Sequence, residues 1–191
     1  MTAGRGLDDL AARSLQQQAS PFDRAGCSVE AGERALEVRA PGVTLALQYR
    51  TQRYFFARIH QLRAVAELVA DGPDEPCELQ LEVRNRRRGS FRWRGAPGAA
   101  GLVDALNHGS CAQATSDLVS SVDLVECSLR WFPRDRTWQV RIEPYAGSQV
   151  RLLLPPLRDI STLTAAEAGV VVRMARAVSA ALRGAPEPAT T

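Results

Sequence analysis

Runs in which apolar and polar residues alternate constrain the fold of this chain more than any other feature of its sequence. Apolar residues at every second position place their side chains on one face of a strand. Three pairs of such runs, each joined by a short turn, predict three β-hairpins: 36–40 with 43–49, 77–83 with 91–94, and 125–131 with 138–142. A further strand is expected at 150–154. Because each strand has one polar face, we expect an antiparallel sheet covered by helices on one side rather than a doubly wound parallel sheet.

Apolar residues at helical spacing predict helices around these hairpins. A first stripe lies within residues 1–20 and ends before Pro21, because the residue before a proline disfavours the helical conformation. A second stripe, over 54–70, predicts another helix, although its first residues could instead prolong the preceding strand. A short third helix is expected at 102–107, with one more helical turn at 117–122.

The last helix carries the clearest signals. Thr164 and Glu167 have the spacing of a capping box, in which each side chain bonds a free backbone N–H of the first turn. Gly184 lies just past the expected end of the helix. The stripe expected to be buried follows helical spacing: Val171, Met174, Val178 and Leu182.

The expected order of elements is α-ββ-α-ββ-α-βββ-α, which is an α+β fold built from successive hairpins with helices packed mainly on one face. We expect an N-terminal helix at 1–20, a single domain at 21–184 and a flexible tail at 185–191. Residues 78–87 resemble the segment 48 positions further on, which suggests a repeated hairpin-plus-helix unit.

Composition excludes several classes of enzyme. All 24 basic residues are Arg, so the chain lacks the phosphate-binding Lys of P-loop proteins, the strand Lys of protein kinases and any Lys for Schiff-base chemistry. The four cysteines contain no CxxC pair, which favours reduced thiols and predicts no disulfide. Without a signal sequence or an apolar run long enough to span a bilayer, we expect a cytoplasmic protein with no membrane partner. No cofactor or metal is expected.

Two possible sites have weak support. Asp104, His108 and Cys111 would share one face of an unbroken helix, as a carboxylate, an imidazole and a thiol, but Gly109 interrupts that helix. The glycine-rich loop 95–101 follows a strand and precedes a helix, where free N–H groups can bind anions. Its spacing matches neither a dinucleotide-binding fingerprint nor a P-loop, which favours a simple connection.

A cluster of arginines is the stronger candidate, and we call residues 84–94 the Arg hairpin. No acidic residue occurs between Glu82 and Asp104, while the remaining 18 arginines of the chain are outnumbered by 21 acidic residues. Positive charge is therefore concentrated there, as expected for a surface that binds phosphates or a protein partner. The six candidate residues are Arg84, Arg86, Arg87, Arg88, Arg92 and Arg94.

The alternation of side chains on the second strand of the Arg hairpin indicates what kind of molecule the hairpin could bind. Phe91 and Trp93 point to one face, and Arg92 and Arg94 to the other. Proteins that stack bases need aromatic and cationic side chains on the same exposed face. A solvated hairpin tip that discourages edge-to-edge pairing is the simplest alternative.

The scarcity of catalytic groups favours a non-catalytic binding module that docks a protein partner, which could be acidic, through its sheet or the Arg hairpin. The alternative is a nucleic-acid-binding protein that contacts phosphates through the Arg hairpin. A third hypothesis is a small-molecule enzyme whose pocket collects His60, His108 or the cysteines from distant parts of the chain.

Overall fold

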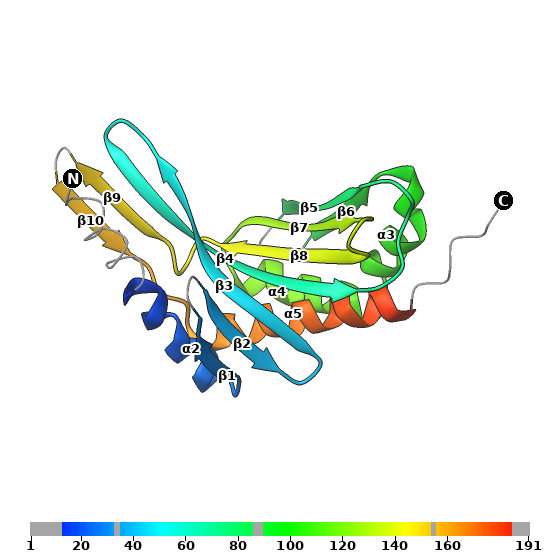
Figure 1. The fold of residues 1–191 in the computed structure, drawn as a ribbon, viewed down its shortest axis with the longest axis horizontal. Coiled ribbons are helices and arrows are strands. Elements are labelled where there is room, and N and C mark those ends of the chain that lie inside the picture. The colour runs from blue at the N-terminus through cyan, green and yellow to red at the C-terminus, as the bar shows by residue number, and fades with distance from the viewer. Residues whose placement is uncertain (1–12, 33–34, 86–89, 154–155, 185–191) are drawn as a thin grey trace.

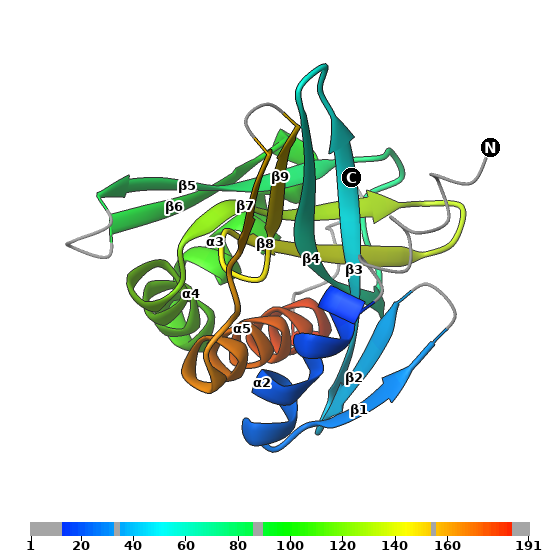
Figure 2. The ribbon, with the colours of Figure 1, turned by 90° about the vertical axis from the view of Figure 1, so that its left-hand side faces the viewer.

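The computed structural model describes residues 13–32, 35–85, 90–153 and 156–184. A twisted antiparallel sheet forms one layer and the helices pack against one of its faces (Figure 1, Figure 2), which confirms the α+β prediction. The strands are β1 (Ser28–Ala31), β2 (Leu36–Ala40), β3 (Val43–Arg53), β4 (Ala57–Val69), β5 (Glu78–Asn85), β6 (Ser90–Gly95), β7 (Leu124–Phe132), β8 (Thr137–Pro144), β9 (Gln149–Leu153) and β10 (Pro156–Ile160).

Strands far apart in the sequence lie side by side in this sheet. The main order is β1-β2-β3-β4-β8-β7-β5-β6, and every pair is antiparallel. The long strand β4 pairs with β8 along its second half and with β9 along its first half, and β9 also pairs with β10. The sheet therefore extends beyond β8 as a four-stranded end made by β3, β4, β9 and β10.

The predicted helix at 54–70 is wrong, because these residues form the tip of the β3–β4 hairpin and strand β4. The apolar residues that suggested a helix belong to both faces of the strand. Leu62 and Ala66 are buried on the side of the helices, whereas Val69 is on the opposite side and exposed. Pairing on both edges satisfies the backbone of β4, so tertiary structure overrides the local pattern.

The three predicted hairpins are confirmed, and their alternation identifies the core. Trp93, Leu129, Trp138 and Ile142 are fully buried, as the apolar face requires. The predicted strand at 150–154 is β9, which begins one residue earlier, whereas β1 and β10 were not predicted. Nothing tests the proposed repeat, which stays a prediction.

The helices also differ in part from the predictions. Residues 13–17 are helical and α2 (Ala19–Arg24) follows, so the chain does not leave the helical conformation at Pro21. Pro21 lies in the first turn of α2, where a missing N–H costs no intrahelical bond. The predictions for residues 1–12 and for the tail 185–191 lie outside the described residues.

A short 3₁₀ turn, η2 (Pro97–Ala99), leads into α3 (Ala100–Asn107), and α4 (Gly109–Ser121) is longer than the single turn expected. His108 has extended backbone angles and separates α3 from α4, as predicted near Gly109.

The capping box of the last helix, α5 (Ala165–Gly184), is confirmed. Thr164 Oγ1 accepts a bond from Glu167 N at 3.2 Å, and Glu167 Oε2 accepts one from Thr164 N at 2.7 Å. All four residues of the predicted stripe are buried. Among the described helices, none is long and apolar enough to cross a bilayer.

Candidate binding surfaces

The sheet face opposite the helices carries ordered rows of polar side chains. Register places Arg141 beside Ser128, and Ser128 beside Gln80. Figure 2 shows the described helices on the other side of the sheet, so none of them covers this face. We call it the open face.

A buried ion pair lies at the centre of the open face. Arg63 Nη2 lies 2.5 Å from Glu143 Oε1, and the Glu143 side chain is only 2% exposed. Burial, together with the nearby charges of Arg63 and Arg130, lowers the pKa of the Arg141 guanidinium, although an arginine remains charged in proteins. Glu126 Oε1 is 3.8 Å from Arg141 Nη1 and partly offsets that repulsion. The open face therefore holds fixed charges in defined positions.

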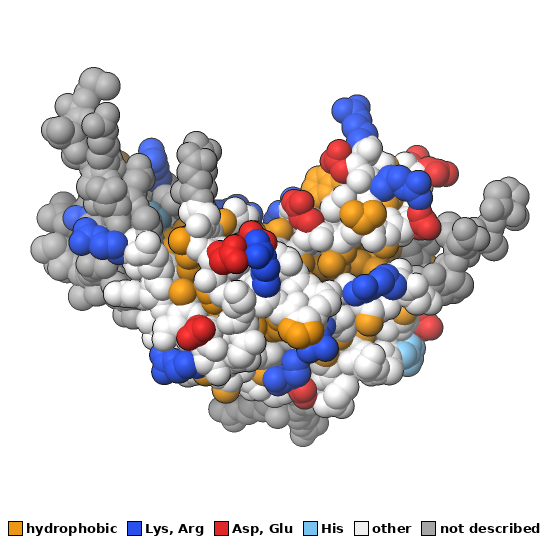
Figure 3. Space-filling model, turned by 60° about the horizontal axis from the view of Figure 1, so that its bottom comes forward, with side chains coloured by type: hydrophobic (Ala, Val, Ile, Leu, Met, Phe, Trp, Pro, Cys, Tyr) orange, Lys and Arg blue, Asp and Glu red, His pale blue; other side chains and the backbone are white. Residues whose placement is uncertain are grey.

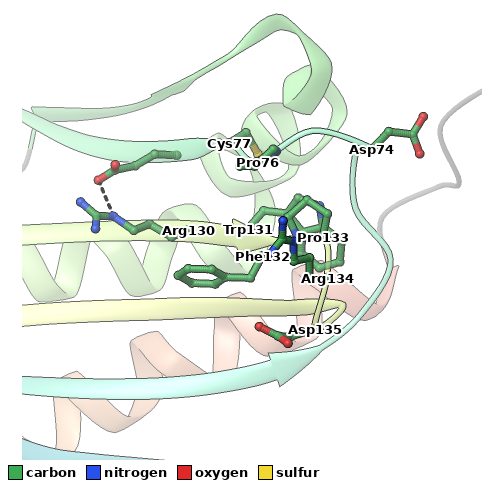
Figure 4. Close-up of a pocket in the computed structure, with 10 residues that line it drawn as sticks. Asp74, Pro76, Cys77, Arg130, Trp131, Phe132, Pro133, Arg134 and Asp135 are labelled. Carbon is green, nitrogen blue, oxygen red and sulfur yellow. Dashed lines mark ion pairs between the residues drawn. The ribbon is translucent and has the colours of Figure 1, made fainter.

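The open face ends in a pocket of about 860 Å³ beside the β7–β8 turn (Figure 4). The pocket brings together the segment before β5, the end of β7 and the turn, which are distant in sequence. Its described lining comprises Asp74, Pro76, Cys77, Glu78, Arg130, Trp131, Phe132, Pro133, Arg134 and Asp135.

Two indole rings hold the wall of this pocket in place. Trp131 Nε1 donates to Pro73 O at 2.5 Å, and Trp138 Nε1 donates to Asp71 O at 3.1 Å. The two rings pack with their centroids 5.2 Å apart. A Cβ atom on Gly72, which lies between the two bonded carbonyls, would be 2.6 Å from the Trp131 ring, so only glycine fits there without displacement. These contacts pack Trp131, which lines the pocket, closely against the 71–73 segment.

The pocket has an apolar floor and a rim with charges of both signs. Trp131 is buried beneath it and Phe132 is 40% exposed. Arg130 Nε is 3.1 Å from Glu78 Oε1 (Figure 4). Burial raises the pKa of the Cys77 thiol, which keeps it protonated and a poor nucleophile. No histidine is among the described residues that line it.

The structure separates the residues of the Arg hairpin. Arg84, Arg92 and Arg94 are on its described strands, and Arg94 Nε is 2.9 Å from Glu82 Oε2. Arg86, Arg87 and Arg88 lie outside the described residues. Trp93 is fully buried on the opposite face, where Nε1 donates to Thr115 Oγ1 at 3.3 Å, so this ring is not available for base stacking. A binding role for the Arg hairpin stays a prediction.

Asp104, His108 and Cys111 do not form one site. His108 Nδ1 is 3.2 Å from Asp104 Oδ1, and both side chains are exposed. Cys111 is buried in α4, and burial raises its thiol pKa to about 11. The glycine-rich loop contributes to a depression of about 510 Å³ that Arg92, Asp104 and His108 also line, but Cys111 does not. The three residues do not meet because the helix is interrupted at His108, which separates α3 from α4.

The remaining candidates are also dispersed. His60 is buried in β4, and its Nδ1 lies 2.9 Å from Thr51 Oγ1. All four cysteines are free, which confirms the prediction of no disulfide. Within the described residues, no three His, Cys, Asp or Glu side chains are close enough to hold a metal ion.

Sequence reasoning missed two features. The pocket depends on contacts between distant segments, which no local pattern reveals. The tip of the β3–β4 hairpin carries three consecutive exposed aromatic residues, Tyr54, Phe55 and Phe56. The sequence does contain a signal for this tip, because residues 38–66 contain five arginines and no acid, yet the helix prediction placed Phe55 on a buried stripe.

The described surface on the helix side shows no comparable concentration of aromatic or like-charged residues. Figure 3 brings forward the lower side of Figure 1, where α2 and α5 lie, and acidic and basic side chains are interspersed there with small hydrophobic patches.

Comparison with known proteins identifies a family. No curated protein and no solved structure matches the chain. Residues 20–182 match the family described as "Protein of unknown function (DUF3156)". The match covers the fold from α2 to α5, and the chain therefore belongs to this family.

Proposed function

We propose that the protein is a non-catalytic binding module that docks a protein partner on the open face of its sheet. The pocket beside the β7–β8 turn would receive the partner's anchoring side chain. The observation that carries this proposal is the combination, in one pocket, of an aromatic floor with charges of both signs. Interfaces between proteins concentrate binding free energy where an aromatic residue fills or lines such a pocket and polar groups surround it.

The charges of the rim favour a polypeptide over a nucleic acid. Three acidic residues, Asp74, Glu78 and Asp135, stand beside Arg130 and Arg134. Phosphates would be repelled by the three carboxylates, whereas a polypeptide can offer an apolar anchor together with amide groups and charges of either sign.

The Arg hairpin would contribute to the same docking face. Arg92 shares the open face with Glu78, because register pairs Arg92 with Glu82 and the two glutamates are four residues apart on β5. An acidic partner that spans the open face would therefore also meet Arg92. Nucleic-acid binding through the Arg hairpin has less support, since Arg94 is paired with Glu82 and Trp93 is buried.

Site-specific photocrosslinking tests the proposal. A benzophenone amino acid at Phe132 would lie at the pocket, and the same group at Val125, an exposed residue at the other end of β7, is the matched control. We expect a nuclease-resistant crosslinked protein from position 132 that is absent from position 125. Identical products from both positions, or no product from position 132, would refute docking at the pocket. Loss of the product after nuclease treatment would favour the nucleic-acid alternative.

A further inference from the structure

The end of the sheet made by β3, β4, β9 and β10 has a surface chemistry of its own. The residues of these strands that lie nearest the β3–β4 tip are 50–60, 149–153 and 156–160. We call them the arm. Figure 1 shows the β3–β4 hairpin and the β9–β10 hairpin projecting from the same end of the molecule. Figure 2 shows the β3–β4 hairpin extending beyond the helices.

One row across the arm consists of four arginines in direct register. Arg53 pairs with Arg58, Arg58 with Arg151, and Arg151 with Arg158. Directly paired residues share a face of the sheet, and neighbouring strands are separated by about 5 Å, so the row spans about 15 Å. Arg53 is exposed, and Arg58 and Arg151 are half-buried.

Three arginines of this row are not neutralised by the described part of the protein. No described carboxylate forms an ion pair with Arg53, Arg58 or Arg151. Asp159 is the register partner of Val150, so its backbone position is not part of the row. Like charges at directly opposed positions destabilise a sheet. An anion bound beside Arg53, Arg58 and Arg151 would relieve this repulsion.

Strand β9 contributes Arg151 to the row, and buried hydrogen bonds fix the position of this strand. Gln61 Nε2 donates to Pro144 O at 2.7 Å and to Ser148 Oγ at 2.8 Å. Tyr49 Oη donates to Gly147 O at 2.9 Å, and Gly147 has a φ of 86°, which favours glycine. The segment 145–148 is thereby held out of the sheet, and Arg151 comes into register with Arg58. The row is built into the fold.

Apolar residues follow immediately beyond the arginine row in both hairpins. Tyr54, Phe55 and Phe56 are 57%, 86% and 53% exposed, and the two phenyl rings touch edge to face with centroids 4.6 Å apart. In the β9–β10 hairpin, the register positions beyond Arg151 and Arg158 are all apolar: Leu152 paired with Leu157, and Leu153 with Pro156. Leu152 also pairs with Ala57, so the two apolar ends are adjacent.

We propose that the arm binds the surface of an anionic lipid bilayer. The aromatic tip enters the interface between headgroups and acyl chains, and the arginine row contacts lipid phosphates. Aromatic side chains favour this interface, and basic residues within reach of it are attracted to anionic lipids. Arginine matches a phosphate with two parallel hydrogen bonds.

The two levels of the arm favour a bilayer over other anions. One residue along a strand is about 3.4 Å, so the apolar ends begin one step beyond the charges, as acyl chains lie beneath phosphates. A nucleic acid supplies phosphates and bases that can stack on exposed rings, but it has no apolar layer that three adjacent rings at a hairpin tip can enter. The expectation of no membrane partner considered only chain segments that span a bilayer, and a peripheral contact requires none.

Vesicle co-sedimentation with the full chain tests the proposal. We expect binding to phosphatidylcholine vesicles that contain phosphatidylserine and much weaker binding to phosphatidylcholine alone. Arg58→Ser combined with Arg151→Ser should reduce the partition coefficient about 25-fold, at roughly fivefold for each basic residue lost. Arg173→Gln combined with Arg176→Gln removes the same charge from exposed positions of α5 and should change it less than about fivefold.

Insertion of the tip is measured separately with Phe55→Trp. The three native tryptophans are buried, so the added indole reports the tip. We expect a blue shift of its emission with anionic vesicles and quenching by lipids brominated in their acyl chains. A thermal melt establishes that each variant is folded.

Several outcomes would overturn the proposal. The first is equal binding to both vesicle compositions. The second is an equal fall of the partition coefficient in the two double variants. The third is an added indole in the Phe55→Trp variant that stays unquenched on bound protein. Absence of vesicle binding would do so as well, and saturable binding of the arm to polyglutamate or to an RNA oligonucleotide instead would identify another anionic partner.

Discussion

Replacing Gly72 by Ala is expected to destabilise the fold, although glycine-to-alanine changes in ordinary backbone conformations usually stabilise. The φ of Gly72 is not in the left-handed region, so the backbone itself would accept alanine and gain about 0.4–1 kcal/mol from the unfolded state. The new Cβ, however, would lie 2.6, 2.7 and 2.9 Å from three atoms of the Trp131 ring.

The indole cannot retreat easily from that contact. Its Nε1 is bonded to Pro73 O, its backbone N donates to Cys77 O at 2.9 Å, and its other side packs on Trp138. Overpacking a site that cannot relax costs about 1–3 kcal/mol, which exceeds the backbone gain. We therefore expect Gly72→Ala to lower the free energy of unfolding by about 1–2 kcal/mol.

Urea unfolding followed by tryptophan fluorescence measures this difference, and Gly101→Ala provides the control. Gly101 lies in α3 with no atom within 4 Å of its ideal Cβ, so alanine should raise the stability by about 1 kcal/mol. If Gly72→Ala matched or exceeded the wild type in stability, the rigid packing of Trp131 against the 71–73 segment would be refuted. The same variant should also weaken the crosslink from position 132.

Three further changes test other parts of the structure. Glu143→Gln should lower the free energy of unfolding by about 3–5 kcal/mol, because it leaves the charge of Arg63 unpaired in a buried site, and urea unfolding measures the loss. Thr164→Ala removes the cap of α5 and should cost about 1 kcal/mol, and an unchanged unfolding midpoint would refute the capping role. Arg151→Ser should raise stability by about 0.2–1 kcal/mol without vesicles, because it relieves repulsion by Arg58, and a lower melting temperature would contradict that repulsion.

The sequence predicts the parts of the fold in which one face of an element is buried. Alternation identifies the strands that contain Trp93, Trp131 and Trp138, since each has core on one side and solvent on the other. It fails for β4, where Leu62 faces the helices and Val65 is buried on the open face. A strand buried on both faces has no period-2 signal, and its alanines favour a helical interpretation.

The candidate surfaces were less accessible to sequence reasoning than the fold. Arg53 and Arg58 flank the aromatic tip in the sequence, so half of the arginine row could be inferred once the hairpin is recognised. The other half depends on pairing between β4 and β9, which are distant in the chain and are aligned by the bonds of Gln61 and Tyr49. Long-range register of this kind leaves no local pattern.

The arginine row and the pocket differ in whether acidic residues accompany the arginines. Around the pocket and the open face, acids accompany the arginines: Glu143 faces Arg63 and Glu78 faces Arg130. In the arm, the same sheet aligns arginines with one another, although a single acidic residue at the position of Arg151 would relieve the repulsion. Departures from locally favourable choices are expected at functional sites, where an external ligand supplies the missing interaction. This contrast within one sheet is the physical reason for assigning the anionic partner to the arm and the polypeptide to the pocket.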